Sequence, residues 1–295
     1  MRIGIVILPD DRWASARHRW RRAEEYGFDH AWTYDHLGWR DLVDGPWFDA
    51  VATLTAAATV TERLRLGTFV ASPNFRHPVH FAREALAVDD VSGGRLLLGV
   101  GAGGTGFDAE VLGAAALTPG ERVARFTEFL ELLGRLLTED HVSYAGSYYR
   151  AVDARTLPGP VQQPRPPLLV AANGPRALAL AARHGDGWIT TGGQGITDEK
   201  AWWQSVREVS DRFGAAQEQA GRTGTDRYLN LDSSPVYSLS SADAFEDAVG
   251  RARDLGFTDV MAHWPRASSW YAGDEAVLET VAAMLPRLRA SGGNG

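Results

Sequence analysis

A carboxylate and an imidazole stand side by side at Asp35 and His36, directly after the apolar run 31–34. Histidine can accept or donate a proton near neutral pH, and an adjacent carboxylate can orient the ring. A turn that Asp35 caps while His36 merely packs is the alternative interpretation. Enzymes built on an α/β barrel carry their catalytic groups at the carboxyl ends of the strands. At such a position the pair predicts proton transfer.

A second polar segment follows the third apolar run. Residues 67–78 read GTFVASPNFRHP, and Pro78 is a suitable first residue for a helix. Arg76 and His77 stand at that helix start, where either solvent-exposed charges or ligand contacts are compatible with the sequence. The segment predicts a loop from strand to helix at the same end of the fold as Asp35 and His36.

A glycine-rich segment follows the fourth apolar run, with glycines at positions 99, 101 and 104. The spacing matches the dinucleotide fingerprint, but that site needs a helix at once and an acidic residue about 20 positions on. Here residues 105–119 intervene. We therefore favour a loop whose missing side chains let a ligand approach the backbone.

Residues 171–177, AANGPRA, follow the fifth apolar run and open a helical pattern. The free N–H groups of a helix start can bind an anion, and Arg176 adds a positive charge. Thr190, Thr191 and the glycines 192–193 follow the next run and offer hydroxyl and backbone donors. Together these segments predict a phosphate pocket, although a helix cap and a glycine turn would also explain them.

Histidine and tryptophan positions carry less specific signals. His77 and His80 have helical spacing, but no carboxylate pattern accompanies them, so we expect a structural or solvent-facing pair and no metal site. We expect some tryptophans to wall a pocket at the barrel mouth and two others to lie on a helix surface or in an oligomer contact. The first group comprises Trp32, Trp39, Trp47, Trp188, Trp264 and Trp270, and the second Trp202 and Trp203.

The composition is that of a folded globular protein. The chain has 295 residues, of which 44% are hydrophobic and 23% charged, and it contains no cysteine. Disulfides and thiolate nucleophiles are therefore excluded, and we expect a cytoplasmic protein because nothing resembles a signal peptide. A formal net charge of −7 argues against nucleic acid or a membrane surface as partner, and it allows an anionic ligand if the site is locally basic. We expect a small-molecule substrate.

Short β-type runs alternate with helical patterns along the whole chain. This order predicts a (β/α)8 TIM barrel, which we expect to form one domain over residues 1–295. Residues 138–166 interrupt the alternation, and we expect an inserted hairpin between the fourth helix and fifth strand, lying over the barrel mouth. Residues 291–295 are expected to fray. The eight β-type runs are 3–8, 31–34, 64–70, 95–100, 167–172, 188–191, 228–232 and 259–263.

Seven segments carry a resemblance to a known family. They read GFDHAWTYDH at 27–36, LGTFV at 66–70, RHP at 76–78, AREALAVDDVSGGR at 82–95, LGVGAG at 98–103, ANGPR at 172–176 and GDGW at 185–188. Over nearly the whole chain they resemble the luciferase-like flavin/deazaflavin oxidoreductase superfamily. Asp35 and His36 resemble the branch that uses the deazaflavin coenzyme F420. The resemblance implies a (β/α)8 barrel with the coenzyme ring in its mouth, and it favours a homodimer.

The resemblance also implies roles for individual residues. His36 would donate or accept a proton near the reactive face of the ring, with Asp35 orienting it or contacting the coenzyme. Phe69 and Val70 would form a bulge with a non-prolyl cis peptide bond that backs the ring. The remaining coenzyme-binding positions implied are Gly103, Ala172, Asn173, Gly174, Pro175, Arg176 and Thr191.

The activity implied is hydride transfer between F420 and a small organic substrate. In sugar-phosphate dehydrogenases of this branch a glutamate follows the Gly-x-Gly of the fourth-strand loop, whereas this chain has Gly104. Their phosphate-clamping lysines also have no counterpart, since Lys200 is the only lysine. A monooxygenase using reduced FMN and oxygen is the alternative on the same barrel. A non-catalytic flavin-binding protein is a third hypothesis, against which the presence of Asp35 and His36 argues.

Overall fold

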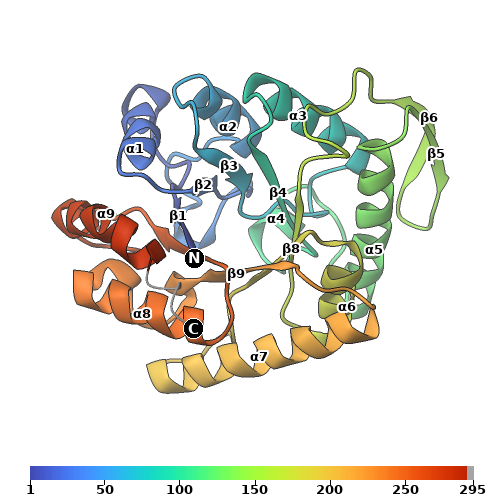
Figure 1. Cartoon of the computed structure of the whole chain (residues 1–295). Helices are drawn as coiled ribbons and strands as arrows, with labels where there is room; N and C mark the ends of the chain where they lie inside the picture. Colours follow the sequence, from blue (N-terminus) through green and yellow to red (C-terminus); the bar gives the residue numbers. More distant parts are fainter. Residues whose placement is uncertain (291–295) are drawn as a thin grey trace.

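Eight parallel strands form a closed barrel in the computed structural model, which describes residues 1–290 (Figure 1). Around the barrel the order is β1-β10-β9-β8-β7-β4-β3-β2, with every neighbouring pair parallel. All eight strands predicted from the sequence are present, and their ends differ from the predicted ones by at most two residues. Their bounds are β1 Arg2–Val6, β2 His30–Thr33, β3 Arg65–Thr68, β4 Leu96–Gly101, β7 Leu168–Ala171, β8 Gly187–Thr190, β9 Asp226–Asn230 and β10 Asp259–His263.

Helices surround the barrel and return the chain to the amino end of the next strand (Figure 1). The (β/α)8 prediction is confirmed. The helices are α1 Trp13–Glu25, α2 Ala50–Ala58, α3 Pro78–Val91, α5 Pro119–Leu136, α6 Pro175–His184, α7 Glu199–Gln219, α8 Ala242–Asp254 and α9 Glu275–Ala290. Shorter elements that the sequence did not predict are α4 Phe107–Glu110 and the 3-10 turns Arg40–Leu42, Leu231–Ser233 and Ser238–Ser240.

The insertion contains the expected hairpin, formed by β5 (His141–Ala145) and β6 (Arg150–Arg155). Its predicted place over the barrel mouth is wrong, because the hairpin packs on the outer side of the helical layer (Figure 1). Glu128 of α5 accepts hydrogen bonds from the backbone N–H groups of residues 147–149 at the hairpin turn. The connection back to β7 is held by Asp89 of α3, which accepts from the N–H of Val161 and Gln162. The expectation for residues 291–295 concerns a part of the chain outside the described residues.

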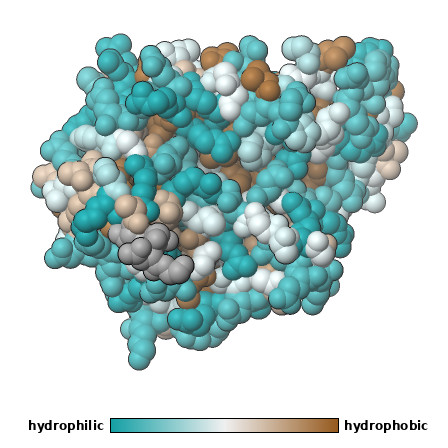
Figure 2. Space-filling view, viewed as in Figure 1, coloured by the Kyte–Doolittle hydropathy of each residue, from teal (hydrophilic) through white to brown (hydrophobic). Residues whose placement is uncertain are grey.

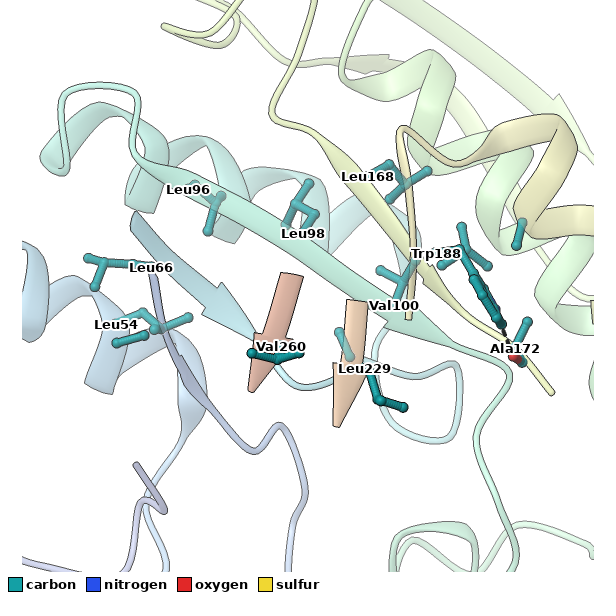
Figure 3. Packing of buried hydrophobic residues seen from close by; sticks show 14 of the residues in the cluster. Leu54, Leu66, Leu96, Leu98, Val100, Leu168, Ala172, Trp188, Leu229 and Val260 are labelled. Atoms are coloured by element: carbon teal, nitrogen blue, oxygen red, sulfur yellow. Dashed lines mark hydrogen bonds between the residues drawn. The ribbon is translucent and has the colours of Figure 1, made fainter. Parts of the chain in front are cut away.

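Side chains alternate between the inside of the barrel and the layer under the helices, as they must along a strand. Figure 3 shows the outer layer, where Leu66, Leu98 and Val260 project from three strands among other apolar side chains. A separate cluster fills the barrel interior and includes Trp32, Leu97 and Met261. This alternation decides which residue after each strand reaches the barrel mouth.

The two tryptophans of α7 contradict the sequence-based expectation. Trp202 is fully buried and Trp203 nearly so, and neither is a surface residue. The indole N–H of Trp202 donates to the carbonyl oxygen of Thr191 at 3.1 Å. Trp202 therefore anchors α7 to the loop after β8, and Trp203 packs against it with ring centroids 4.8 Å apart.

The amino end of the barrel is closed by a charged layer. Asp259 is fully buried and accepts two hydrogen bonds from Arg2, at 2.7 and 2.6 Å, and lies 3.1 Å from Nε2 of His30. Burial would raise the pKa of Asp259, but the hydrogen bonds from Arg2 and His30 outweigh it and lower that pKa to about 2. This layer seals the interior opposite the mouth.

The outer surface is predominantly hydrophilic on the face seen in Figure 2, where apolar residues appear in small separate groups. Within residues 1–290, no helix has the length and apolar character needed to cross a membrane.

Candidate active site

A cavity of about 800 Å³ opens at the carboxyl ends of the strands. Ligand sites of α/β barrels occupy this end, and a volume of this size suits a cofactor with a small substrate. Tyr34, Trp39, Phe69, Trp270 and Tyr271 give it aromatic walls. The other lining residues are His36, Arg40, Val70, Ala171, Ile189, Thr191, Gly193–Thr197, Asn230, Asp232–Pro235.

His36 lines this cavity, as the sequence predicted, and its orienting partner is Asp108. Nδ1 of His36 makes a short hydrogen bond to Asp108, whose second carboxylate oxygen accepts from the N–H of Leu37 at 2.7 Å. The indole of Trp47 donates to the carbonyl oxygen of His36 at 2.8 Å. With Nδ1 engaged, Nε2 is the ring nitrogen available to a molecule in the cavity.

Asp35 points to the other side of the strand end and does not line the cavity. It is buried and accepts hydrogen bonds from Nε and a terminal nitrogen of Arg76, at 3.1 and 2.7 Å. Arg76 also contacts Asp49 at 2.7 Å and Glu84 at 3.1 Å. The expectation that Asp35 orients His36 is therefore corrected, since Asp108 does so. Arg76 is neither a solvated charge nor a cavity residue, because it ties the loops after β2 and β3 together.

The bulge after β3 has the predicted form. The Phe69–Val70 peptide bond is cis, and both side chains line the cavity. The glycines of β4 make room for this bulge, because a Cβ at Gly99 would lie 2.0 Å from the carbonyl oxygen of Thr68. A Cβ at Gly101 would lie 2.9 Å from Val70. Gly99 and Gly101 thus serve the close approach of β3 and its bulge to β4, where the sequence suggested approach of a ligand.

The predicted phosphate segment is organised by Asn173. Its amide donates to the Thr191 hydroxyl at 2.7 Å and accepts from the Thr190 hydroxyl at 2.6 Å, which joins the loops after β7 and β8. Gly174 precedes α6 without a side-chain cap, and Pro175 is its first residue. Of this set Thr191 lines the cavity.

The other predicted coenzyme positions lie at or behind the rim. Ala172 is buried and its carbonyl oxygen accepts from the indole of Trp188 at 2.8 Å. Arg176 is exposed with its guanidinium beside Gly120 at the start of α5. Gly103 has a φ of 74° and packs against Asn74. The structure thus brings His36, Phe69, Val70 and Thr191 to one cavity and leaves the rest outside its lining.

Sequence reasoning missed a buried polar chain at the cavity floor. His263 ends β10 and lies 3.0 Å from Asp232 through Nδ1 and 2.9 Å from the Tyr34 hydroxyl through Nε2. The Tyr34 hydroxyl is in turn 2.8 Å from that of Tyr271. Their place in the sequence could have identified two of these residues, since Asp232 and His263 both stand at the carboxyl ends of predicted strands.

An aromatic clamp joins two loops at the rim. The Arg40 guanidinium lies 4.5 Å from the ring centroid of Trp39 and 4.1 Å from that of Trp270. The Trp270 indole donates to Asp41 at 2.6 Å. Stacked cation–π contacts of this kind stabilise the loop after β2 against the loop after β10.

His77 caps α3 by accepting from the N–H of Val79, so its role is structural, as expected. Across residues 1–290, no group of three or more histidine, aspartate or glutamate side chains is placed to hold a metal ion.

Comparison with known proteins agrees with this barrel. The chain is 34% identical over 282 residues to an F420-dependent glucose-6-phosphate dehydrogenase of Amycolatopsis mediterranei, covering 88% of this chain and 81% of that protein. A solved F420-dependent secondary alcohol dehydrogenase has a TM-score of 0.81 at 18% identity, covering 98% of this chain and 99% of the other. The monooxygenase RslO1 of Streptomyces bottropensis has a TM-score of 0.76 at 22% identity, covering 97% and 99%. These two structures show the fold alone.

The sequence model of the luciferase-like monooxygenase family matches residues 1–275, nearly the whole barrel. Together with the dehydrogenase relative, this match indicates an oxidoreductase. The chain belongs to the luciferase-like monooxygenase family.

Proposed function

We propose that this protein transfers a hydride between coenzyme F420 and a small organic substrate. The observation that carries the proposal is His36, held by Asp108 at a cavity whose wall is the Phe69–Val70 bulge. The 34% identity to an F420-dependent dehydrogenase supports the choice of coenzyme.

The cavity fits such a coenzyme in size and chemistry. Its volume of about 800 Å³ and aromatic walls suit a planar tricyclic ring, and glycines 99 and 101 let the backing bulge form. When bound, the deazaflavin supplies a ring carbon that carries hydride and does not readily form an oxygen adduct. Phe69 and Val70 would support the ring, and Nε2 of His36 would donate or accept a proton at the reactive face of the ring.

The tail of the coenzyme would leave the cavity past the loops after β7 and β8. Asn173 fixes the Thr191 hydroxyl there, and the uncapped N–H groups following Gly174 at the start of α6 favour an anion. Pro175 presets the backbone of this first turn, and Arg176 adds a positive charge beside it. Gly103 and Ala172 would border the path. Asp35 would hold Arg76 in place and thereby stabilise the loops after β2 and β3.

The substrate differs from a sugar phosphate in this proposal. Gly104 replaces the glutamate expected after the fourth strand, and the described cavity has Arg40 as its basic lining residue with a permanent charge. The aromatic walls favour a less polar molecule. We also propose a homodimer, as the family resemblance favours, which sedimentation of the purified protein would test.

An FMN-dependent monooxygenase is the second candidate, because the family model that matches the chain is named for a monooxygenase activity. It would use reduced FMN and oxygen in the same cavity. A preference for FMN over F420, with oxygen consumption, would favour it.

Titration of the purified protein with oxidised F420 and with FMN tests the proposal. Tryptophans 39 and 270 line the cavity, so binding should quench intrinsic fluorescence. We expect tighter binding of F420 than of FMN, and a His36→Ala variant that binds F420 as the native protein does. Its hydride transfer should be more than tenfold slower. Tighter binding of FMN would overturn the coenzyme assignment, and an equal rate in the variant would remove His36 from the mechanism.

A further inference from the structure

A continuous chain of four polar side chains runs inward from the cavity and does not include His36. The Tyr271 hydroxyl lies 2.8 Å from the Tyr34 hydroxyl, which lies 2.9 Å from Nε2 of His263. Nδ1 of His263 lies 3.0 Å from a carboxylate oxygen of Asp232. Tyr271, Tyr34 and Asp232 line the cavity, whereas His263 is fully buried behind them.

The direction of each hydrogen bond follows from Asp232, which only accepts when it is a carboxylate. One of its oxygens accepts from the backbone N–H of Ser238 at 2.8 Å, and the other accepts from the backbone N–H of His263 at 2.5 Å. Nδ1 of His263 must then be the donor to Asp232. Burial lowers the pKa of His263, which favours the neutral ring with Nε2 as an acceptor. The tautomer is assigned from this network.

The directions of the other two hydrogen bonds follow from this assignment. Tyr34 donates to Nε2 of His263, so its oxygen accepts from Tyr271. The Tyr271 hydroxyl thus donates to the Tyr34 oxygen, and the Tyr271 oxygen can accept a hydrogen bond from a donor in the cavity. Every member is arranged to pass a proton inward, toward the Asp232 carboxylate.

Packing holds Tyr271 against the buried histidine of the relay. The Tyr271 ring stacks on His263 with centroids 3.7 Å apart. Tyr271 and Ser269, two residues before it, have positive φ of 61° and 65°. Such backbone conformations are costly for residues other than glycine and concentrate at functional sites.

We propose that Tyr271 is a second catalytic acid–base group of this cavity and that Tyr34, His263 and Asp232 position it and relay its proton. The proposal rests on the hydride-transfer function and adds a substrate class, namely an alcohol oxidised to a carbonyl compound or the reverse.

The step balances in the direction of oxidation. The substrate C–H bond breaks and its hydride passes to the oxidised coenzyme, while the C=O bond forms. The substrate O–H bond breaks and its proton passes to the Tyr271 oxygen. Tyr271 passes its own proton to Tyr34, which passes its own to Nε2 of His263. The resulting imidazolium faces Asp232 and later returns one proton to solvent, and the reverse sequence reduces a carbonyl.

The first test needs no substrate. Nitrogen NMR of histidine-labelled protein, without coenzyme at pH 7, should find His263 neutral with its proton on Nδ1. The Nε2 signal should shift in a Tyr34→Phe variant, because its hydrogen-bond donor is lost. A proton on Nε2, or a charged ring, would overturn the relay whatever the coenzyme proves to be.

The second test uses the coenzyme-loaded enzyme with 2-propanol, cyclohexanol and benzyl alcohol as donors in single-turnover reduction of F420. We expect Tyr271→Phe to slow the reduction at least tenfold with unchanged F420 affinity. Tyr237→Phe is the matched control, since it removes a hydroxyl beside His263 that is outside the relay, and should change the rate less than twofold. Equal rates in the two variants would overturn the proposal.

The pH profile separates a relay from a structural role. Oxidation in the native enzyme should slow at low pH as His263 becomes protonated, and this limb should become weaker in His263→Gln. The titratable and charged groups facing His263 or its tyrosines are Asp232, His36, Tyr34, Tyr237, Tyr271, Arg40 and Arg266. Failure of F420 to bind would refute the hydride-transfer function alone. Binding of F420 without reduction by any of the three alcohols would refute the relay's role.

Discussion

Asp108, in the short helix α4 after β4, holds Nδ1 of His36, which follows β2. The bond joins two loops that are 72 residues apart in the chain. It leaves Nε2 of the imidazole toward the cavity, as a proton-transfer group requires. A carboxylate that orients a histidine in this way also stabilises the charged ring when it forms.

Replacing Asp108 by Asn should therefore slow hydride transfer at least tenfold while F420 affinity stays within twofold of the native value. The physical reason is loss of the negative charge that stabilises the protonated ring. Single-turnover rates and fluorescence titration measure the two quantities. Glu110→Gln is the matched control, because Glu110 is exposed on the same short helix and should be silent. If both variants turned over equally, Asp108 would have no part in the chemistry.

The strand pattern explains why Asp108 and not Asp35 has this position. His30, Trp32 and Tyr34 alternate into the barrel along β2, and His36 continues on the same side. Asp35 falls on the opposite side, where Arg76 meets it. Side chains of successive strand residues point to opposite sides, and this rule could have been applied to the sequence. It would have shown that Asp35 and His36 do not face the same cavity.

The barrel, its eight strands and the cis bulge were predictable because long periodic segments and a family resemblance specify them. Asp108 was not, because a four-residue helix in a glycine-rich loop has no periodicity. The same holds for Tyr271, which reaches His263 from an irregular loop. The burial of Trp202 and Trp203 depends on which face of α7 meets the barrel, and only the packed structure decides that.

Gly99→Ala should disrupt the coenzyme bulge. The added Cβ would stand 2.0 Å from the Thr68 carbonyl oxygen, so β3 and β4 would have to separate. We expect a loss of at least 2 kcal/mol in unfolding free energy, on the order of an overpacked core site, and a weaker affinity for F420. Gly104→Ala is the control, since nothing lies within 4 Å of its Cβ position. Comparable unfolding midpoints in urea would contradict the packing argument.

Arg76→Ala should destabilise the protein through Asp35. The substitution leaves a fully buried carboxylate without its bidentate partner, and such losses cost about 3–5 kcal/mol. Urea unfolding followed by circular dichroism measures this difference. Arg135→Ala provides the comparison, because its pair with Glu139 is an exposed i,i+4 contact whose loss should change the unfolding free energy far less. A small effect for Arg76→Ala would mean that water reaches Asp35.

Asp259→Asn should make the pH dependence of stability shallower in acid. The folded pKa of Asp259, lowered to about 2, lies below its ordinary value of 3.8, so the folded state favours the charged form. The stabilisation is therefore fully present above about pH 4 and is lost as the pH falls through 2. A shift of this size corresponds to about 2 kcal/mol at neutral pH.

Urea unfolding at pH 7 and at pH 3 measures that contribution. The native protein should lose more stability than Asp259→Asn over this interval, so the two unfolding free energies should converge in acid. Asp226→Asn is the control, because Asp226 also pairs with Arg2 at 2.7 Å but its side chain is 40% exposed. Solvent screens that pair, and its removal should cost less than about 1 kcal/mol at either pH. Parallel curves for native protein and Asp259→Asn would show that the buried layer at the amino end does not depend on the charge of Asp259.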